Sequence, residues 1–140
     1  MKAITVLQPY ASLIAEGLKK YETRGWPTTY QGPIAIHAGK QNLFNGLDFV
    51  TGAEIQNALP VLPDILPAGA VIAIAEITDC IEMTDEFIKS LPRLEILFGH
   101  YKVGRYAWKL ENVRKIEPMP ARGMQKIWNW EVEQDALQYL

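Results

Sequence analysis

The sequence has little of what metal, disulfide or covalent chemistry requires. It holds two histidines and a single cysteine, Cys80, so an internal disulfide is excluded. Neither a cysteine cluster nor an H-E-x-x-H string occurs, and no metal site is expected. The sequence also lacks G-x-G-x-x-G, Walker and G-x-S-x-G motifs, so redox cofactors and a serine nucleophile have no support. We therefore expect neither a cofactor nor a metal.

Long hydrophobic runs are also missing. No stretch of 18 apolar residues occurs, which argues against a membrane span. The apolar run within residues 1–9 is too short for the core of a signal peptide. Together with the single cysteine, these absences predict a reducing, cytoplasmic setting. The oligomeric state is left open.

What the chain does have is one domain's length and an uneven charge distribution. The net charge of the 140 residues is −2, which argues against a protein that coats long nucleic acid by charge alone. Residues 1–40 carry five Lys or Arg against two acids, and residues 100–126 carry seven against two. Residues 41–99 carry nine acids against two bases. A positive face is therefore expected if the two basic segments meet in the fold.

Short elements of both kinds follow one another along the chain. Apolar or alternating runs predict strands at residues 2–7, 21–24, 34–38, 69–81, 104–116 and 127–132. Helical spacing or an acidic start predicts helices over 9–16 and from residue 84, with weaker patterns at 40–58 and 135–140. Strands and helices do not alternate, which argues against a doubly wound sheet. We expect an α+β fold, a small mixed β-barrel with short helices at its rim.

The most informative stretch is residues 17–24, where the first helix ends and a strand begins. Gly17 suits the left-handed position that follows a helix. Lys19 and Lys20 then lie near the negative end of the helix dipole, which favours cations. Glu22 and Arg24 follow within the predicted strand. Two ammonium groups, a carboxylate and a guanidinium at a rigid helix end indicate either a site or a solvated turn with a surface ion pair.

Two polar residues in apolar strands have alternatives that the sequence leaves open. Glu76 interrupts the most hydrophobic strand, where a buried carboxylate is costly unless it is paired. It either faces water or points into a pocket and pairs with a cation of residues 19–24. His37 ends another apolar strand and is either a structural residue or part of the site.

Aromatic residues lie close to basic ones in the sequence. Trp26 and Trp108 are candidates for stacking on a nucleobase. Trp128 and Trp130 have period-two spacing and are not expected to face one pocket. Arg122 lies in a basic, glycine-containing turn over residues 120–126, which is either a solvated hairpin loop or a wall of the site.

These residues carry a resemblance to a known family. The string Q-P-Y-A at residues 8–11 is followed by G-x-K-x-x-E-x-R at residues 17–24. Further agreement comes from I-A-I-H at 34–37, G-A-V-I-A at 69–73 before Glu76, and Y-A-W at 106–108. The pattern resembles the signature of the ASCH domain, the activating signal cointegrator homology family of the PUA-like superfamily. It spans roughly residues 2–132.

The resemblance implies a compact β-barrel with a cleft beside the G-x-K-x-x-E-x-R segment. It implies one ASCH domain over residues 1–140, with insertions near 40–66 and 84–100. Family members are regarded as RNA- or nucleic-acid-binding modules, so the cleft is expected to hold RNA, a nucleotide or a nucleoside. Some small bacterial members hydrolyse N4-acetylcytidine-type amides, and one branch has been described as ribonuclease-like.

The hydrolases of the family use a Lys, a Thr three positions later, and a Glu in a later strand. Lys20, Thr23 and Glu76 reproduce that spacing. Aligned on the first and last residues of the motif, however, the hydrolase Lys falls on Lys19 and its Thr on Glu22. A slip of one residue turns strand side chains to the opposite face, so Lys20 and Thr23 are not expected to substitute. If this chain is a hydrolase, Lys19, Glu22 and Glu76 would carry proton transfer.

Three functions follow as hypotheses. The first is a module that binds RNA or a nucleobase-bearing small molecule through cations, base-reading carboxylates and stacking indoles. The second is an amidohydrolase acting on modified cytidine, and the third is a protein-interaction domain that uses the acidic segment 41–99. The expected ligand-binding residues are Gln8, Tyr10, Lys19, Lys20, Glu22, Thr23, Arg24, Trp26, His37, Lys40, Glu76, Trp108 and Arg122.

Overall fold

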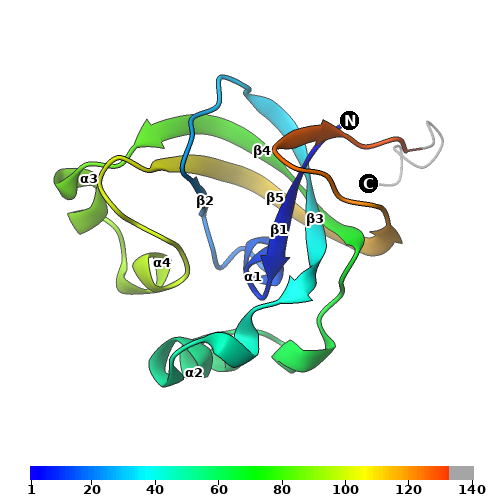
Figure 1. The fold of residues 1–140 in the computed structure, drawn as a ribbon, viewed down its shortest axis with the longest axis horizontal. Helices are drawn as coiled ribbons and strands as arrows, with labels where there is room; N and C mark the ends of the chain where they lie inside the picture. Colours follow the sequence, from blue (N-terminus) through cyan, green and yellow to red (C-terminus); the bar gives the residue numbers. More distant parts are fainter. Residues whose placement is uncertain (133–140) are drawn as a thin grey trace.

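A single mixed sheet organises the protein. The computed structural model describes residues 1–132 of the chain. Six strands lie in the order β2-β5-β4-β3-β1-β6 (Figure 1). The β1 and β3 pair is parallel, and the other neighbouring pairs are antiparallel. The strands are β1 (Lys2–Gln8), β2 (Tyr21–Arg24), β3 (Gly32–Asn42), β4 (Ala70–Glu82), β5 (Tyr106–Pro120) and β6 (Ile127–Asn129).

Short helices lie around this sheet. In Figure 1, α1 lies against the sheet near its centre, α2 lies below it, and α3 and α4 lie together at one end. Thr84 caps α3 by accepting a hydrogen bond from the backbone N–H of Phe87, as the acidic helix start predicts. The helices are α1 (Tyr10–Ala15), α2 (Phe49–Ala58), α3 (Asp85–Lys89) and α4 (Arg93–Leu97), with 3₁₀ turns η1 (Phe44–Gly46) and η2 (Pro63–Ile65). No helix among the described residues is long and apolar enough to cross a membrane.

The α+β class is confirmed, whereas closure into a barrel is not. The sheet curves strongly in Figure 1, but β2 and β6 remain its two edges. A closed barrel needs hydrogen bonds between its first and last strands. No such pairing joins β2 to β6 within residues 1–132.

Strand β4 is buried on both faces, as its nearly continuous apolar sequence predicts. Ala73, Ala75 and Ile77 pack into the main core together with α1. Val71 and Ile74 belong to a second cluster with Trp128 and Trp130. Because side chains alternate along a strand, β4 contributes residues to both clusters, although Ile72 and Ala73, next to a register shift in the ladder with β5, both lie in the main core.

The end of α1 has the hydrogen bonds of a Schellman motif, in agreement with the sequence. Gly17 has a φ of +74°, and its N–H donates to the carbonyl of Ile14 at 2.9 Å. The N–H of Leu18 donates to the carbonyl of Leu13, also at 2.9 Å. This turn stops the helix and directs residues 19–24 into β2, which pairs with β5.

Some predicted boundaries and orientations are wrong. Strand β6 ends at Asn129 instead of residue 132. Trp128 and Trp130 share one cluster, against expectation, because residues two positions apart in an extended chain project from the same face. Strand β5 continues past Pro118. Strand β2 pairs only with the first residues of β5, so one edge of β5 is unpaired near Pro118, and a proline is tolerated at an unpaired edge. The helix predicted at 135–140 lies outside the described residues.

Candidate functional site

The cavity beside the end of β1 collects most of the charged residues of the 17–24 segment. We call it the first cavity; its volume is about 470 Å³. Its walls come from β1, α1, β2 and the segment between α4 and β5. The lining residues are Thr5, Val6, Leu7, Tyr10, Lys19, Glu22, Thr23, Arg24, Leu43, Phe98, Gly99, His100 and Arg105.

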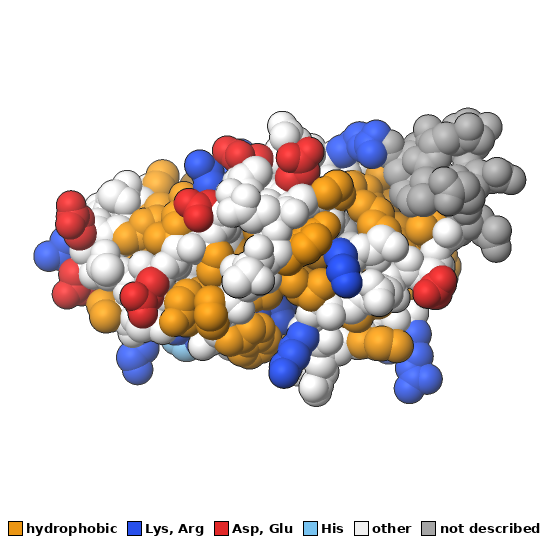
Figure 2. Space-filling view, turned by 90° about the horizontal axis from the view of Figure 1, so that it is seen from above, with side chains coloured by type: hydrophobic (Ala, Val, Ile, Leu, Met, Phe, Trp, Pro, Cys, Tyr) orange, Lys and Arg blue, Asp and Glu red, His pale blue; other side chains and the backbone are white. Residues whose placement is uncertain are grey.

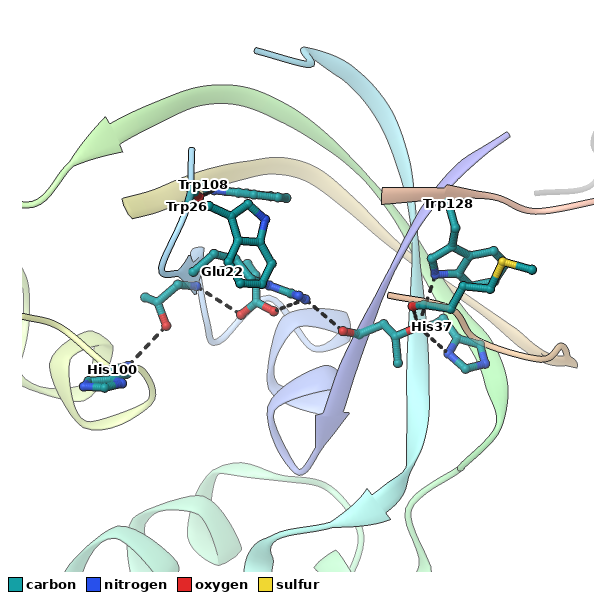
Figure 3. A network of polar contacts seen from close by, with 10 residues as sticks. Glu22, Trp26, His37, His100, Trp108 and Trp128 are labelled. Atoms are coloured by element: carbon teal, nitrogen blue, oxygen red, sulfur yellow. Dashed lines mark hydrogen bonds and ion pairs between the residues drawn. The ribbon is translucent and has the colours of Figure 1, made fainter. Parts of the chain in front are cut away.

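Arg24 is the most firmly held cation of the first cavity. Its Nη2 donates to Glu22 Oε2 at 3.0 Å and to the carbonyl of Thr5 at 2.8 Å (Figure 3). Its guanidinium carbon lies 5.7 Å from the ring centroid of Trp26 and 5.8 Å from that of Trp108. Both distances fall within the range of a cation–π contact. Arg24 therefore enters the cavity with a fixed orientation.

The carboxylate of Glu22 holds Arg24 and the backbone of β2 in place. Glu22 lies two residues before Arg24 in β2, so the two side chains project from the same face of the strand. Its Oε1 accepts a hydrogen bond from the backbone N–H of Thr23 at 3.1 Å. The residue is 7% exposed, and the ion pair with Arg24 compensates the burial of its charge.

Lys19 brings to the cavity a buried amine whose hydrogen-bonding capacity is unused. The residue is 1% exposed, and among the described residues its Nζ has no hydrogen-bond partner. Burial lowers the pKa of Lys19, and the nearby Glu22 and Glu95 carboxylates oppose this shift only in part. A Cβ at Gly99 would lie 3.2 Å from Nζ and 2.6 Å from a ring carbon of Tyr101. Gly99, which has no side chain, therefore leaves space next to the Lys19 amine.

Glu95 and Tyr101 form a buried pair beneath Lys19 that the sequence did not indicate. Glu95 is 5% exposed, and it accepts hydrogen bonds from the backbone N–H of Lys20 at 2.8 Å and from the Tyr101 hydroxyl at 3.1 Å. Burial, followed by the charge of Glu95, raises the pKa of Tyr101. Glu95 is the only acid in a short apolar helix, which is the weak signal that sequence reasoning could have used.

The rim of the first cavity contains further residues without any sequence signal. The backbone N–H of His100 donates to Thr23 Oγ1 at 3.2 Å, and Arg105 Nε donates to the carbonyl of His100 at 3.0 Å. These bonds fix the segment after α4 against β2. Both residues lie in the irregular segment between α4 and β5, where local sequence patterns do not reveal contacts with distant residues.

A second cavity, of about 860 Å³, adjoins the first. Thr5 and Leu7 line both cavities. Lys40 and Arg122 lie in the second cavity and not in the first, where the sequence had grouped them with Lys19. The remaining lining residues are His37, Gly39, Gly69, Pro120, Ala121, Gly123, Met124 and Gln125.

His37 is held by structural contacts in the wall of the second cavity. Its Nε2 lies 2.7 Å from the carbonyl of Ala121, a distance that requires Nε2 to donate. In the neutral ring, Nδ1 then accepts from the Thr5 hydroxyl at 3.1 Å. The indole N–H of Trp128 donates to the same hydroxyl oxygen, also at 3.1 Å (Figure 3). His37 therefore connects β1, β3 and the segment after β5.

Glu76 lines neither cavity, so the alternative in which it points into the pocket and pairs with a cation of residues 19–24 is wrong. Its neighbours Ala75 and Ile77 belong to the main core cluster. Because strand side chains alternate, Glu76 projects from the opposite face of the sheet. It lines a separate cavity with Arg114 and Met1, among others. The predicted set of Lys19, Glu22 and Glu76 is not brought together.

Of the other predicted residues, some line a cavity and one has a structural role. Tyr10 and Thr23 line the first cavity. Lys20 lines a different cavity, because it follows Lys19 and points away from it. Gln8 is buried, accepts a hydrogen bond from the backbone N–H of Ser12 at 3.0 Å, and donates to a carbonyl at 2.8 Å. Gln8 is therefore a structural residue at the start of α1.

The two basic segments do meet, and they meet at the cavities. Arg105 joins Lys19 and Arg24 in the first cavity, and Arg122 joins Lys40 in the second. On the face in Figure 2, Lys and Arg side chains are scattered among apolar and acidic ones, without a continuous basic patch. Across residues 1–132, no group of three or more His, Cys, Asp or Glu side chains could hold a metal ion.

Comparisons with known proteins agree on the fold. The model of the ASCH domain family matches residues 4–120. A crystal structure of ASCH from Zymomonas mobilis is similar at a TM-score of 0.58 and 15% identity, covering 98% of this chain and 90% of that one. A Ser-to-Ala mutant of that protein gives 0.57 at 14% identity, covering 99% and 92%. A search of curated proteins finds no significant match.

Proposed function

The chain belongs to the ASCH domain family, and on that premise we propose that it binds RNA or a nucleobase-bearing small molecule in the first cavity. The family is associated with RNA binding and with the PUA-like fold. The volume of the first cavity, about 470 Å³, lies within the range of roughly 300–1,000 Å³ typical of small-molecule sites. One flipped-out base with its sugar fits this description.

The observation that carries the proposal is the pre-oriented Arg24 beside an unpartnered Lys19. Arg24 already has its ion pair and its carbonyl acceptor, so little ordering is required when a ligand arrives. Within residues 1–132 the Nζ of Lys19 has no partner, and a ligand oxygen would supply one. These two cations bind carbonyl or phosphate oxygens, and Glu22 keeps Arg24 in place.

Trp26 provides the stacking surface in this proposal. It is 43% exposed, whereas Trp108 is 1% exposed and donates its indole N–H to the carbonyl of Trp26 at 3.2 Å. Trp26 is not among the lining residues of the first cavity, but its ring centroid lies 5.7 Å from the guanidinium carbon of Arg24, which does line it. A base bound beside Arg24 can therefore stack on the exposed part of this ring. Each stacked base contributes about 1–3 kcal/mol to binding.

Replacing Trp26 with alanine is expected to weaken binding of a short RNA by about ten-fold or more, because one stacking contact is lost. Phe49→Ala is the matched control, since Phe49 is 88% exposed and, unlike Trp26, has no cation–π contact with Arg24. Isothermal titration with nucleosides and RNA oligomers at fixed salt measures both. Equal affinities for the two variants would contradict the stacking role, and the absence of any binding would contradict the proposed function.

A second candidate function, hydrolysis of an N4-acetylcytidine-type amide, is favoured by the buried amine of Lys19. With its pKa lowered by burial, this amine can take a proton from water that attacks the amide carbonyl carbon. Arg24 would bind the developing oxyanion, and the proton would pass to the leaving amine as the C–N bond breaks. Glu76 lines a different cavity, so this version excludes it.

The hydrolase hypothesis has its own test. N4-acetylcytidine is incubated with the protein, and release of acetate and cytidine is followed by chromatography. We expect Lys19→Met to abolish turnover and Glu76→Gln to leave it unchanged. Turnover that survives Lys19→Met would exclude the amine as the base.

The domain organisation is part of the same proposal. We propose one ASCH domain in which the segments near 40–66 and 84–100 are insertions on the common core. Leu43 and Phe98, which lie in these segments, line the first cavity. The insertions would therefore adjust the cavity to the ligand of this particular protein.

A further inference from the structure

The two cavities are connected through one residue of β1. The carbonyl of Thr5 accepts from Arg24 in the first cavity at 2.8 Å. The hydroxyl of Thr5 contacts His37 Nδ1 at 3.1 Å in the wall of the second. Figure 3 follows this line of contacts from Glu22 to His37. Thr5 and Leu7 also line both cavities, so the hollow surface continues across the end of β1.

The charge of this continuous surface is strongly positive. Lys40 and Arg122 line the second cavity, and no Asp or Glu occurs among its lining residues in the described part of the chain. The first cavity contributes three Lys or Arg residues and a single carboxylate. The whole chain carries a net charge of −2, so the excess of cations at the cavities is opposite in sign to the charge of the protein. Such a surface attracts a ligand with several negative charges.

The wall that carries Arg122 is fixed by close packing. A Cβ at Gly123 would lie 2.6 Å from His37 Cε1 and 2.6 Å from Thr5 Oγ1, so only glycine allows this approach. The carbonyl of Ala121 accepts from His37 at 2.7 Å. The N–H of Ala121 donates to the carbonyl of Gly69 at 3.0 Å. The second cavity is therefore a built feature and not a gap beside a loose loop.

We propose that the two cavities form one groove for a single-stranded RNA segment of two or more nucleotides. The first cavity takes one nucleotide, and Lys40 and Arg122 in the second bind the phosphate of the next. This inference rests on the proposed function and specifies its ligand. A free nucleoside would fill only the first cavity and would leave the cations of the second without a partner.

Chain length is the variable that tests the groove. Binding is measured by titration for cytidine monophosphate and for cytidylate oligomers of two and four nucleotides over a range of salt concentrations. We expect the tetranucleotide to bind about ten-fold or more tightly than the mononucleotide in ~0.1 M salt. Each additional phosphate contact should steepen the slope of log K against log salt by about 0.7.

Lys40→Ala/Arg122→Ala should bring the ratio of mononucleotide to tetranucleotide Kd close to one. It should also reduce the salt slope for the tetranucleotide by about 1.4, because two phosphate contacts are lost. Arg93→Ala/Lys109→Ala is the matched control, since it removes the same charge from residues outside both cavities. This control variant should keep the ratio of mononucleotide to tetranucleotide Kd found for the unmodified protein.

Two results overturn the groove. The first is a mononucleotide that binds as tightly as the tetranucleotide to the unmodified protein, which leaves the proposed function intact. The second is an equal loss of length dependence in the control variant, which would indicate unspecific electrostatic attraction. If neither ligand binds at all, the proposed function fails together with the groove.

Discussion

Arg24→Ala is expected to destabilise the protein by about 3 kcal/mol and to abolish ligand binding. The substitution removes the partner of Glu22, which is 7% exposed and would become a buried, uncompensated charge. Breaking one half of such a pair costs about 3–5 kcal/mol. It also removes the hydrogen bond to the Thr5 carbonyl and the contacts with two indole rings. For a chain of this length, the midpoint of thermal unfolding should fall by about 10 °C.

The stability loss can be separated from the binding loss by a double-mutant cycle. Glu22→Gln removes the charge that Arg24→Ala leaves unpaired, so the double variant should be more stable than Arg24→Ala alone. Its binding should remain absent, because the guanidinium is still missing. Urea unfolding of the four proteins gives the coupling energy. Additive single effects would mean that the ion pair does not stabilise the site.

Arg93→Ala provides the reference for an exposed ion pair. Arg93 donates to Glu54 at 3.1 Å, but its side chain is 63% exposed. A pair of this kind contributes about 0–1 kcal/mol, so its loss should hardly change the unfolding midpoint. A loss as large as that of Arg24→Ala would show that burial does not distinguish the two pairs.

The part of the site that could be predicted from the sequence depends on local geometry. Gly17 ends α1 by a rule that involves only neighbouring residues, and the hydrogen bonds of the turn follow it. The projection of Glu22 and Arg24 from one face follows from strand alternation alone. The ion pair between them needs no knowledge of the remaining chain. The ASCH family assignment rests on this segment together with short strings elsewhere in residues 2–132, and it is confirmed.

The remaining parts depend on contacts between residues that are distant in the sequence. Glu76 lies in a strand buried on both faces, so no apolar alternation indicates which face carries its carboxylate. Glu95 accepts from the backbone N–H of Lys20 because α4 and the segment after it fold back against β2. Thr5 joins the cavities through partners at positions 24, 37 and 128. The sequence around Glu95 and Thr5 does not indicate which distant residues these side chains meet.

The sequence pattern also could not predict whether the sheet closes into a barrel. Counting six strands is compatible with a barrel or with an open, curved sheet. The difference is decided by the pairing of the edge strands, and β2 and β6 are only four and three residues long. Strands this short present few donors and acceptors to a partner. The edge β2 instead lies beside the first cavity, to which it contributes three lining residues.

Lys19→Met is expected to abolish binding while making the protein more stable by roughly 1–2 kcal/mol at pH 7. The methionine side chain is similar in length and carries no charge, so it removes the cost of a buried, unpartnered ammonium group. Glu22 keeps its pairing with Arg24, and Glu95 keeps the Tyr101 hydroxyl. Both carboxylates that attract Lys19 therefore retain other partners. Opposite signs for stability and binding are typical of a functional residue.

The dependence on pH gives a second, independent measurement. The pKa of Lys19 is lowered in the folded state from its usual 10.5, so the unfolded chain binds more protons between the two pKa values. The stability of the unmodified protein should rise with pH in that window, and its disadvantage relative to Lys19→Met should be largest below it. Urea unfolding between pH 6 and about 10 follows the difference. Lys20→Met, at an exposed neighbour, keeps Lys19 and should therefore show the same pH trend as the unmodified protein.

These expectations distinguish a binding residue from a structural one. If the amine of Lys19 stabilised the fold through Glu22 and Glu95, the methionine variant would unfold more easily and the pH trend would have the opposite sign. If the amine instead serves to bind a ligand, Lys19→Met should increase the stability of the unliganded protein and remove the stabilisation that the ligand provides. The comparison must therefore be made with and without bound ligand. Saturating cytidylate tetranucleotide should raise the unfolding midpoint of the unmodified protein and leave that of Lys19→Met unchanged.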